Sequence, residues 1–142
     1  MKSMKSRYLL DTNVLSEPLR PDPDEGVLAM IDRHGESLAT SSVVWHELQF
    51  GARRLPKGRR RTLIEAYLQN VVAPSIPILP YDEAAAEWHA SERARLARRG
   101  APLPFADGQI AATARVNGLV LVTRNVADFE PYEGLRLENW HS

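Results

Sequence analysis

Residues 7–15 read RYLLDTNVL, an apolar run that ends abruptly at an acidic residue and a hydroxyl residue. The run over residues 7–10 is short and does not alternate polar with apolar side chains, which is typical of a strand buried on both faces. Asp11 and Thr12 then offer side-chain oxygens that cap a following helix. This stretch predicts a buried strand with Asp11 at its carboxyl end.

The rest of the chain alternates between helical segments and short apolar runs. Apolar spacing, caps and breakers predict helices over residues 26–34, from the caps at 41 and 42 to 55, and over 59–72, 82–99 and 105–117. Apolar runs predict strands over residues 37–40, 75–79, 119–123 and 135–137, with 139–142 as a tail. Strands separated by helices indicate a parallel sheet covered on both faces. We therefore predict an α/β fold and one domain over residues 1–142.

Composition limits the chemistry. The chain has 142 residues, 44% of them hydrophobic, which is enough for one core. Its formal net charge of zero does not mark it as a nucleic-acid binder in the way a strongly basic chain would be marked. The absence of cysteine excludes disulfides and thiolate metal sites, leaves hard oxygen ligands, and fits a reducing cytoplasm. The positive start over residues 1–7 precedes an apolar run too short for a signal peptide, so neither secretion nor membrane insertion is expected.

Four acidic residues stand at the ends of predicted elements. Asp11 follows the first strand and Asp128 lies just beyond the fourth, while Glu47 and Asp107 lie near the starts of two helices. In a parallel sheet these positions open onto one edge, where ligands bind. Carboxylates a few ångströms apart disfavour joint ionisation unless a cation neutralises them. The pattern predicts a magnesium or manganese site that can activate a water and cleave a phosphodiester.

Each acid also has an ordinary structural explanation. Asp11 can simply cap a helix, and Asp107 can complement a helix dipole. Four independent caps need not share one edge of a sheet, so their common placement favours the metal site.

Four segments around these acids resemble the motifs of the PIN-domain family, and within it the VapC-like toxins of bacterial toxin–antitoxin modules. The segments, in chain order, are LLDTNVLSE at 9–17, VVWHELQFGA at 43–52, PFADGQIAATA at 104–114 and LVTRNVADF at 121–129. The likeness covers nearly the whole chain, and no motif departs from the pattern. It implies a sheet of about five parallel strands, endoribonuclease activity, a homodimer, and inhibition by a small antitoxin whose tail covers the site.

The resemblance also suggests roles for individual residues. Our hypothesis is that Asp11 and Asp107 coordinate the principal metal, while Glu47 and Asp128 hold a second ion or the waters of the first. Three further residues are placed to orient these carboxylates, and a role in a turn or a helix cap fits each of them equally well. They are Thr12, Thr123 and Asn125.

A basic cluster spans a predicted helix junction. It consists of Arg53, Arg54, Lys57, Arg59, Arg60 and Arg61. The cluster can follow an RNA backbone, with counterion release making affinity fall as salt rises. It can equally be a solvated helix surface. The apolar faces of the first helices, with Trp45 and Phe50, can also line a groove for an antitoxin helix.

Two other functions compete with the nuclease. A phosphohydrolase of the haloacid-dehalogenase kind also begins with an aspartate after its first strand, but it uses a second Asp two positions on, where this chain has Asn13. That chemistry also expects a late lysine, whereas the last lysine here is Lys57. The second alternative is a PIN-like module that binds RNA or a protein without cutting. Degenerate PIN domains typically lose acids, and this chain keeps all four.

Overall fold

The sheet contains five strands, all parallel, in the order β3-β2-β1-β4-β5. It is seen in a computed structural model, which describes residues 6–142. The strands are β1 (Tyr8–Leu10), β2 (Leu38–Ser41), β3 (Ile78–Leu79), β4 (Val120–Val122) and β5 (Leu137–Glu138). All five were predicted, although most of the observed strands are shorter than the predicted runs.

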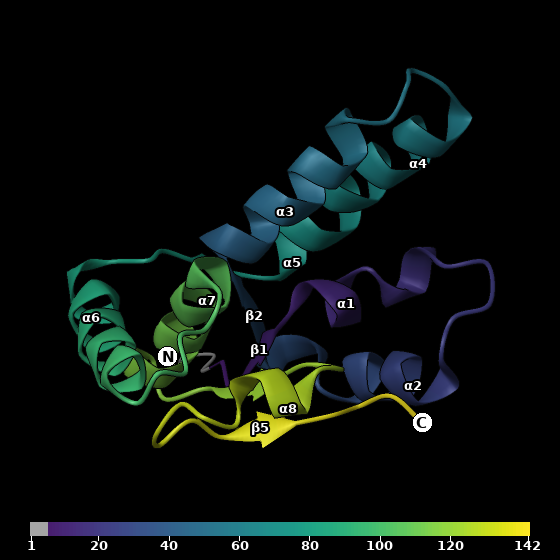
Figure 1. Ribbon diagram of the computed structural model, residues 1–142. Helices are drawn as coiled ribbons and strands as arrows, with labels where there is room; N and C mark the ends of the chain where they lie inside the picture. The colour runs from purple at the N-terminus through teal and green to yellow at the C-terminus, as the bar shows by residue number, and fades with distance from the viewer. Residues whose placement is uncertain (1–5) are drawn as a thin grey trace.

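Helices cover both faces of the sheet, so the predicted α/β fold with three layers is confirmed. In Figure 1, α6 and α7 lie to the left of the strands and α2 lies to the right. The helices are α1 (Thr12–Leu15), η1 (Glu17–Leu19), α2 (Glu25–Arg33), η2 (Gly35–Ser37), α3 (Ser42–Arg53), α4 (Arg59–Tyr67), the π-helical turn η3 (Leu68–Val72), α5 (Ala73–Ser75), α6 (Glu83–Arg98), α7 (Phe105–Val116) and α8 (Val126–Phe129).

The first apolar run forms β1, the central strand of the sheet, and this position explains why the run does not alternate polar with apolar side chains. β1 pairs with β2 on one side and with β4 on the other, with Leu9 opposite both Ala39 and Leu121. Leu9 and Leu10 are both 0% exposed. Burying a leucine side chain contributes roughly 1.5–3 kcal/mol, so this strand anchors the core.

The strand order places a topological switch point at β1. The chain passes from β1 to β2 on one side and later returns through β4 on the other. The backbone N–H of Asp11 donates to the carbonyl of Val122 at 2.9 Å, which ties the ends of β1 and β4 together. In open α/β sheets, ligands bind at the carboxyl edge beside such a point.

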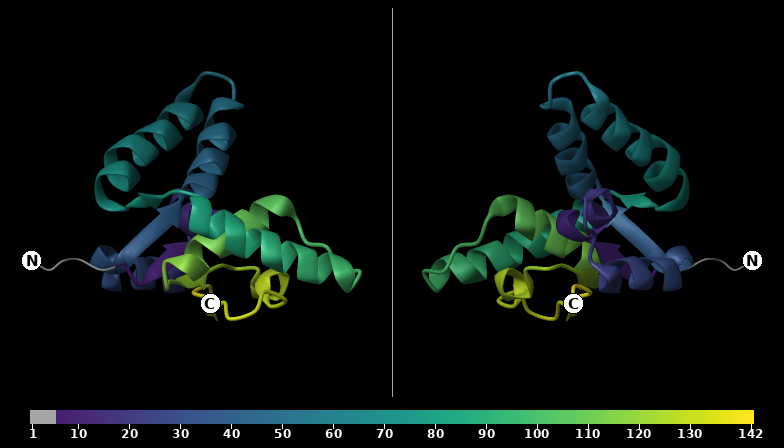
Figure 2. Two further views of the ribbon diagram at one scale, coloured as in Figure 1. Left: turned by 90° about the vertical axis from the view of Figure 1, so that its left-hand side faces the viewer. Right: turned by 90° about the vertical axis from the view of Figure 1, so that its right-hand side faces the viewer.

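Helices α3 and α4 form a hairpin that projects from the rest of the molecule (Figure 2). The Tyr67 hydroxyl donates to the carbonyl of Leu15 at 2.8 Å and joins the base of this hairpin to α1. The predicted continuous helix over residues 59–72 is wrong in its last turn, which is π-helical. This turn buries Leu68 and Val72 completely.

Three short features differ from the sequence predictions. The proline-rich stretch contains η1, because Pro18 occupies its first turn, where no backbone donor is needed. The predicted strand over 75–79 begins later, since Ala73–Ser75 is helical. Residues 139–142 are not a loose tail: Trp140 is buried, and the Nε2 atom of His141 lies 3.2 Å from Oε1 of Glu17.

Glu17 is a buried carboxylate that should make folding stability depend on pH. The backbone N–H of Asp24 donates to it at 2.8 Å, and this bond, with His141 and Arg20 nearby, holds the pKa of Glu17 below its ordinary value. A lowered pKa stabilises the fold above the unfolded-state pKa, about 4.3, and the contribution disappears as pH falls through the folded-state pKa. Urea unfolding should therefore show Glu17→Gln less stable than the wild type near neutral pH, with the difference shrinking below about pH 4.3. A difference that grows on acidification would contradict this.

Within residues 6–142, no helix has both the length and the apolar character needed to cross a bilayer. Residues 1–5, which belong to the positively charged start of the chain, lie outside the described residues.

Candidate metal centre

Asp11 lies at the end of β1, is 7% exposed and forms the N-cap of α1. Its Oδ1 accepts the backbone N–H of Thr12 at 2.8 Å, and its Oδ2 accepts the hydroxyl of Thr123 at 2.8 Å. Burial raises the pKa of Asp11, the two hydrogen bonds lower it, and the charges of Glu47 and Asp128 raise it further. The side chain is held rigidly in a position where its negative charge is disfavoured.

Glu47 lies in the second turn of α3, which begins at the edge of the sheet because Ser41 ends β2 and caps the helix. The Ser41 hydroxyl accepts the backbone N–H of Val44 at 3.0 Å. The Thr12 hydroxyl donates to Oε1 of Glu47 at 2.5 Å. Thr12 therefore links two of the acids, through its backbone to Asp11 and through its side chain to Glu47.

Asp107 lies in the first turn of α7 and is half-buried. Burial is the main cause of its raised pKa, followed by the charges of Asp11, Asp128 and Glu47. Asp128 lies on α8 beyond β4 and is exposed. The charges of Glu47 and Asp128 raise the pKa of Asp11, and those of all three other acids raise the pKa of Asp107, so the four predicted side chains converge on one region.

The convergence is looser than a coordination shell. Within residues 6–142, no group of three or more acidic or histidine side chains is arranged to hold one metal ion. The pocket beside Glu47 is lined by Thr12 but not by the other three acids. A bound cation would therefore have to draw the carboxylates together.

The chemistry of the donors fits a hard divalent cation. Asp11, Glu47, Asp107 and Asp128 supply only carboxylate oxygens, which Mg²⁺ and Mn²⁺ prefer. The raised pKa of Asp11 and Asp107 comes from desolvation and from like charge, and a cation would relieve both.

The three residues predicted to orient the acids are placed differently. Thr12 and Thr123 donate to carboxylates as such residues would, and their roles stay predictions. Asn125 takes part through its backbone: its N–H donates to the Thr123 hydroxyl at 3.1 Å, and its carbonyl accepts the N–H of Asp128 at 3.0 Å. Within residues 6–142 its side chain makes no hydrogen bond. The turn after β4, and not the asparagine side chain, supports Thr123.

Sequence reasoning missed two residues near the acids. The Asn13 side-chain oxygen accepts the backbone N–H of Arg124 at 3.1 Å and joins the turns that follow β1 and β4. Burial, together with the charges of Asp107 and Glu92, raises the pKa of Tyr132 to about 12, so this phenol is neutral beside the acids. Asn13 belongs to the PIN-like motif at 9–17, which could have pointed to it, whereas no motif or spacing in the sequence pointed to Tyr132.

Replacing Thr123 by valine should weaken metal binding about 10- to 100-fold, the usual cost of losing a residue that orients a ligand. The substitution keeps the shape but removes the donor to Asp11 and the acceptor for the Asn125 backbone. Calorimetric titration with Mn²⁺ measures the change. Thr113→Val is a matched control, because its buried hydroxyl donates only within α7, to Gln109. Equal affinities for the two variants would refute an orienting role.

The fold and this acidic edge define the class: a three-layer α/β protein with a candidate carboxylate metal centre at the switch point of its sheet. The family described as PIN domain matches residues 8–132, so the chain belongs to the PIN-domain family.

Several relatives of this chain are toxins or ribonucleases by name. It is 39% identical over 125 residues to VapC ribonuclease Y4jK of Sinorhizobium fredii, covering 86% of this chain and 89% of that protein. It is 36% identical over 136 residues to toxin FitB of Neisseria gonorrhoeae, covering 94% and 98%. The crystal structure of FitAcB from Neisseria gonorrhoeae matches with a TM-score of 0.87 and 36% identity over 95% of this chain and 99% of that one.

Proposed function

We propose that this chain is a metal-dependent endoribonuclease and the toxin of a VapBC-type toxin–antitoxin pair. The observation that carries the proposal is the pair of hydrogen bonds by which Thr12 joins Asp11 to Glu47 at the edge of the sheet of a PIN-family chain. The raised pKa of Asp107, caused first by burial and then by the charges of Asp11, Asp128 and Glu47, supports it. The relatives named ribonuclease and toxin also support it.

The four acids would divide the metal ligation between them. Asp11, which is buried, and Asp107, which like Glu47 is half-buried, would hold the principal Mg²⁺ or Mn²⁺ ion, and Glu47 and Asp128 would hold a second ion or the waters of the first. These acids would thereby place a cation whose charge would help to activate a water for attack on phosphorus and would stabilise the negative phosphodiester. Thr12 and Thr123 keep two carboxylates oriented.

The partners follow from the same proposal. The substrate is RNA, and a small VapB-like antitoxin would cover the site, as the resemblance implies and as the toxin name of a relative supports. The homodimer, the cytoplasmic location and a single domain over residues 1–142 stay predictions. One buried cluster that joins β1, β2 and β4 to α2 and α7 supports the single domain.

Induction in cells tests the function. The wild type and Asp11→Ala are expressed to equal levels, and new RNA 5′ ends are mapped. Only the wild type should produce new ends. The same ends from both proteins, or none from either, would contradict the proposal.

The two alternatives have separate tests. Membership of the PIN family excludes the haloacid-dehalogenase fold. A module that binds without cutting would keep its RNA-dependent effect in the presence of a chelator, whereas the proposed nuclease loses all cleavage and recovers it when Mn²⁺ is restored.

A further inference from the structure

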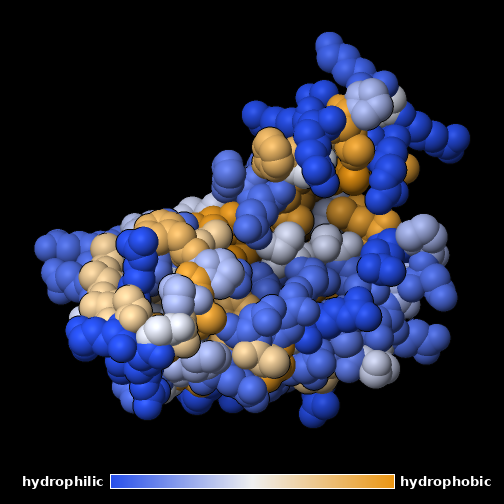
Figure 3. Space-filling view, in the orientation of Figure 1, coloured by the Kyte–Doolittle hydropathy of each residue, from blue (hydrophilic) through white to orange (hydrophobic). Residues whose placement is uncertain are grey.

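A pocket of about 410 Å³ lies between η1 and the α3–α4 hairpin, directly beside Glu47. Its floor is apolar and includes Leu19, Leu48 and Leu55. Figure 3 shows apolar surface where the hairpin meets the rest of the molecule, bordered by hydrophilic groups. A second hollow of about 440 Å³ continues it along α4 and shares Leu19 and Arg60 with it.

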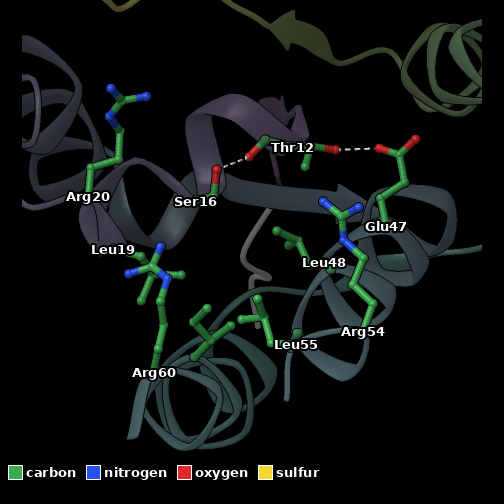
Figure 4. Close-up of a pocket in the computed structure, with 12 residues that line it drawn as sticks. Thr12, Ser16, Leu19, Arg20, Glu47, Leu48, Arg54, Leu55 and Arg60 are labelled. Atoms are coloured by element: carbon green, nitrogen blue, oxygen red, sulfur yellow. Dashed lines mark hydrogen bonds between the residues drawn. The ribbon is translucent and has the colours of Figure 1, made fainter. Parts of the chain in front are cut away.

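The rim of this pocket is cationic. Figure 4 shows Arg54 and Glu47 on one side of the pocket and Arg60 and Arg20 on the opposite side. Arg20 lies 3.7 Å from Glu17, which partly neutralises it. Arg54 and Arg60 form no ion pair with any side chain of residues 6–142. Arg54, Arg60 and the partly neutralised Arg20 outnumber Glu47, the one carboxylate among the lining residues, so the pocket favours an anionic ligand.

Only part of the basic cluster predicted from the sequence lines this pocket, namely Arg54 and Arg60. Arg61 is committed to Glu65 at 3.1 Å and to the carbonyl of Leu55 at 3.4 Å. Arg53 does not line the pocket, although it is the neighbour of Arg54. Arg20, which lies outside the cluster, joins the rim.

We propose that this pocket binds one nucleotide of single-stranded RNA next to the phosphodiester at the acids. This inference rests on the proposed nuclease function and adds where the substrate lies. Guanidinium groups match phosphate oxygens two at a time, and an apolar floor suits the flat face of an unpaired base. An antitoxin helix would also fit an apolar groove, but the excess of positive charge favours RNA.

Binding is measured separately from cleavage, with Asp107→Asn as an uncleaving background. Fluorescence anisotropy follows a labelled oligouridine at several salt concentrations. Arg54→Gln and Arg60→Gln should each weaken binding about tenfold and reduce the salt slope by about 0.7, the value for one contact to a single strand. Arg53→Gln and the distant Arg33→Gln should change affinity less than about twofold.

Competition tests the apolar floor. Uridine 5′-monophosphate should displace the oligouridine at a lower concentration than inorganic phosphate does, because only the nucleotide has a base to place on the apolar floor. Equal competition by the two would overturn the nucleotide assignment.

The outcomes distinguish a failure of the pocket proposal from a failure of the proposed nuclease function. If the wild type cleaves RNA but Arg54→Gln and Arg60→Gln bind it like Arg53→Gln, the pocket proposal is wrong and the nuclease stands. That result would assign the pocket to a protein partner. If RNA neither binds nor is cut, both proposals fail.

Discussion

Asp107→Asn is expected to reduce RNA cleavage by roughly 1000-fold, equivalent to about 4 kcal/mol of lost transition-state stabilisation. The change keeps the shape of the side chain but removes a charge that a divalent cation would neutralise. Initial rates on purified RNA with saturating Mn²⁺ measure the loss. Glu83→Gln, in the first turn of the neighbouring helix α6, is the matched control and should leave the rate unchanged.

The same variant should not lose stability. Burial and the charges of the other acids raise the pKa of Asp107, so its ionised form destabilises the metal-free fold near neutral pH. With a chelator present, Asp107→Asn should therefore unfold at the same temperature as the wild type or a higher one. A variant that cuts RNA at the wild-type rate, or that is inactive only because it is unfolded, would refute the assigned role.

Gly108→Ala is expected to destabilise the protein by about 1–3 kcal/mol, the usual cost of overpacking a core. A Cβ atom at Gly108 would lie 2.6 Å from Cδ2 of His89 and closer still to its Nε2. His89 is 3% exposed and its Nδ1 lies 2.8 Å from the Tyr81 hydroxyl, so the ring has little room to move. The clash outweighs the gain of about 1 kcal/mol that alanine brings to a helix interior.

Two further variants show whether the clash is the cause. In a His89→Ala background, Gly108→Ala should become neutral or stabilising, because only the helix propensity remains. Gly51→Ala on α3 should also be neutral or stabilising, since nothing lies within 4 Å of its added Cβ. Chemical unfolding measures all of these changes. An unchanged cost of Gly108→Ala without His89 would exclude the contact.

The strands, and the burial of the central ones, were predictable from residues 7–15 and from similar apolar runs, because a strand covered on both faces cannot contain polar alternation. The order of the strands in the sheet was not predicted. The short helix α8 was not predicted. The turn of α8 that carries Asp128 spans four residues, and its formation depends on the packing of Phe129 in the core. Helices this short have no periodicity from which to predict them.

The four acids of the candidate site were predictable from the sequence, but the hydrogen bonds that connect them were not. Positions at the ends of elements led to Asp11 and Asp107, whereas the Thr12 hydroxyl on Glu47 joins residues 35 positions apart. The basic cluster shows the same limit. Sequence cannot separate Arg54 from Arg53, because which side chain faces the pocket depends on how the α3–α4 hairpin lies against η1.

Titration of the purified protein with Mn²⁺, followed by calorimetry, tests the metal centre most directly. The wild type should bind the ion saturably near neutral pH and more weakly on acidification, because protons compete for the carboxylates. Asp11→Asn should lose this binding and remain folded. No saturable binding by the wild type, or equal binding by Asp11→Asn, would contradict a cation held by these acids.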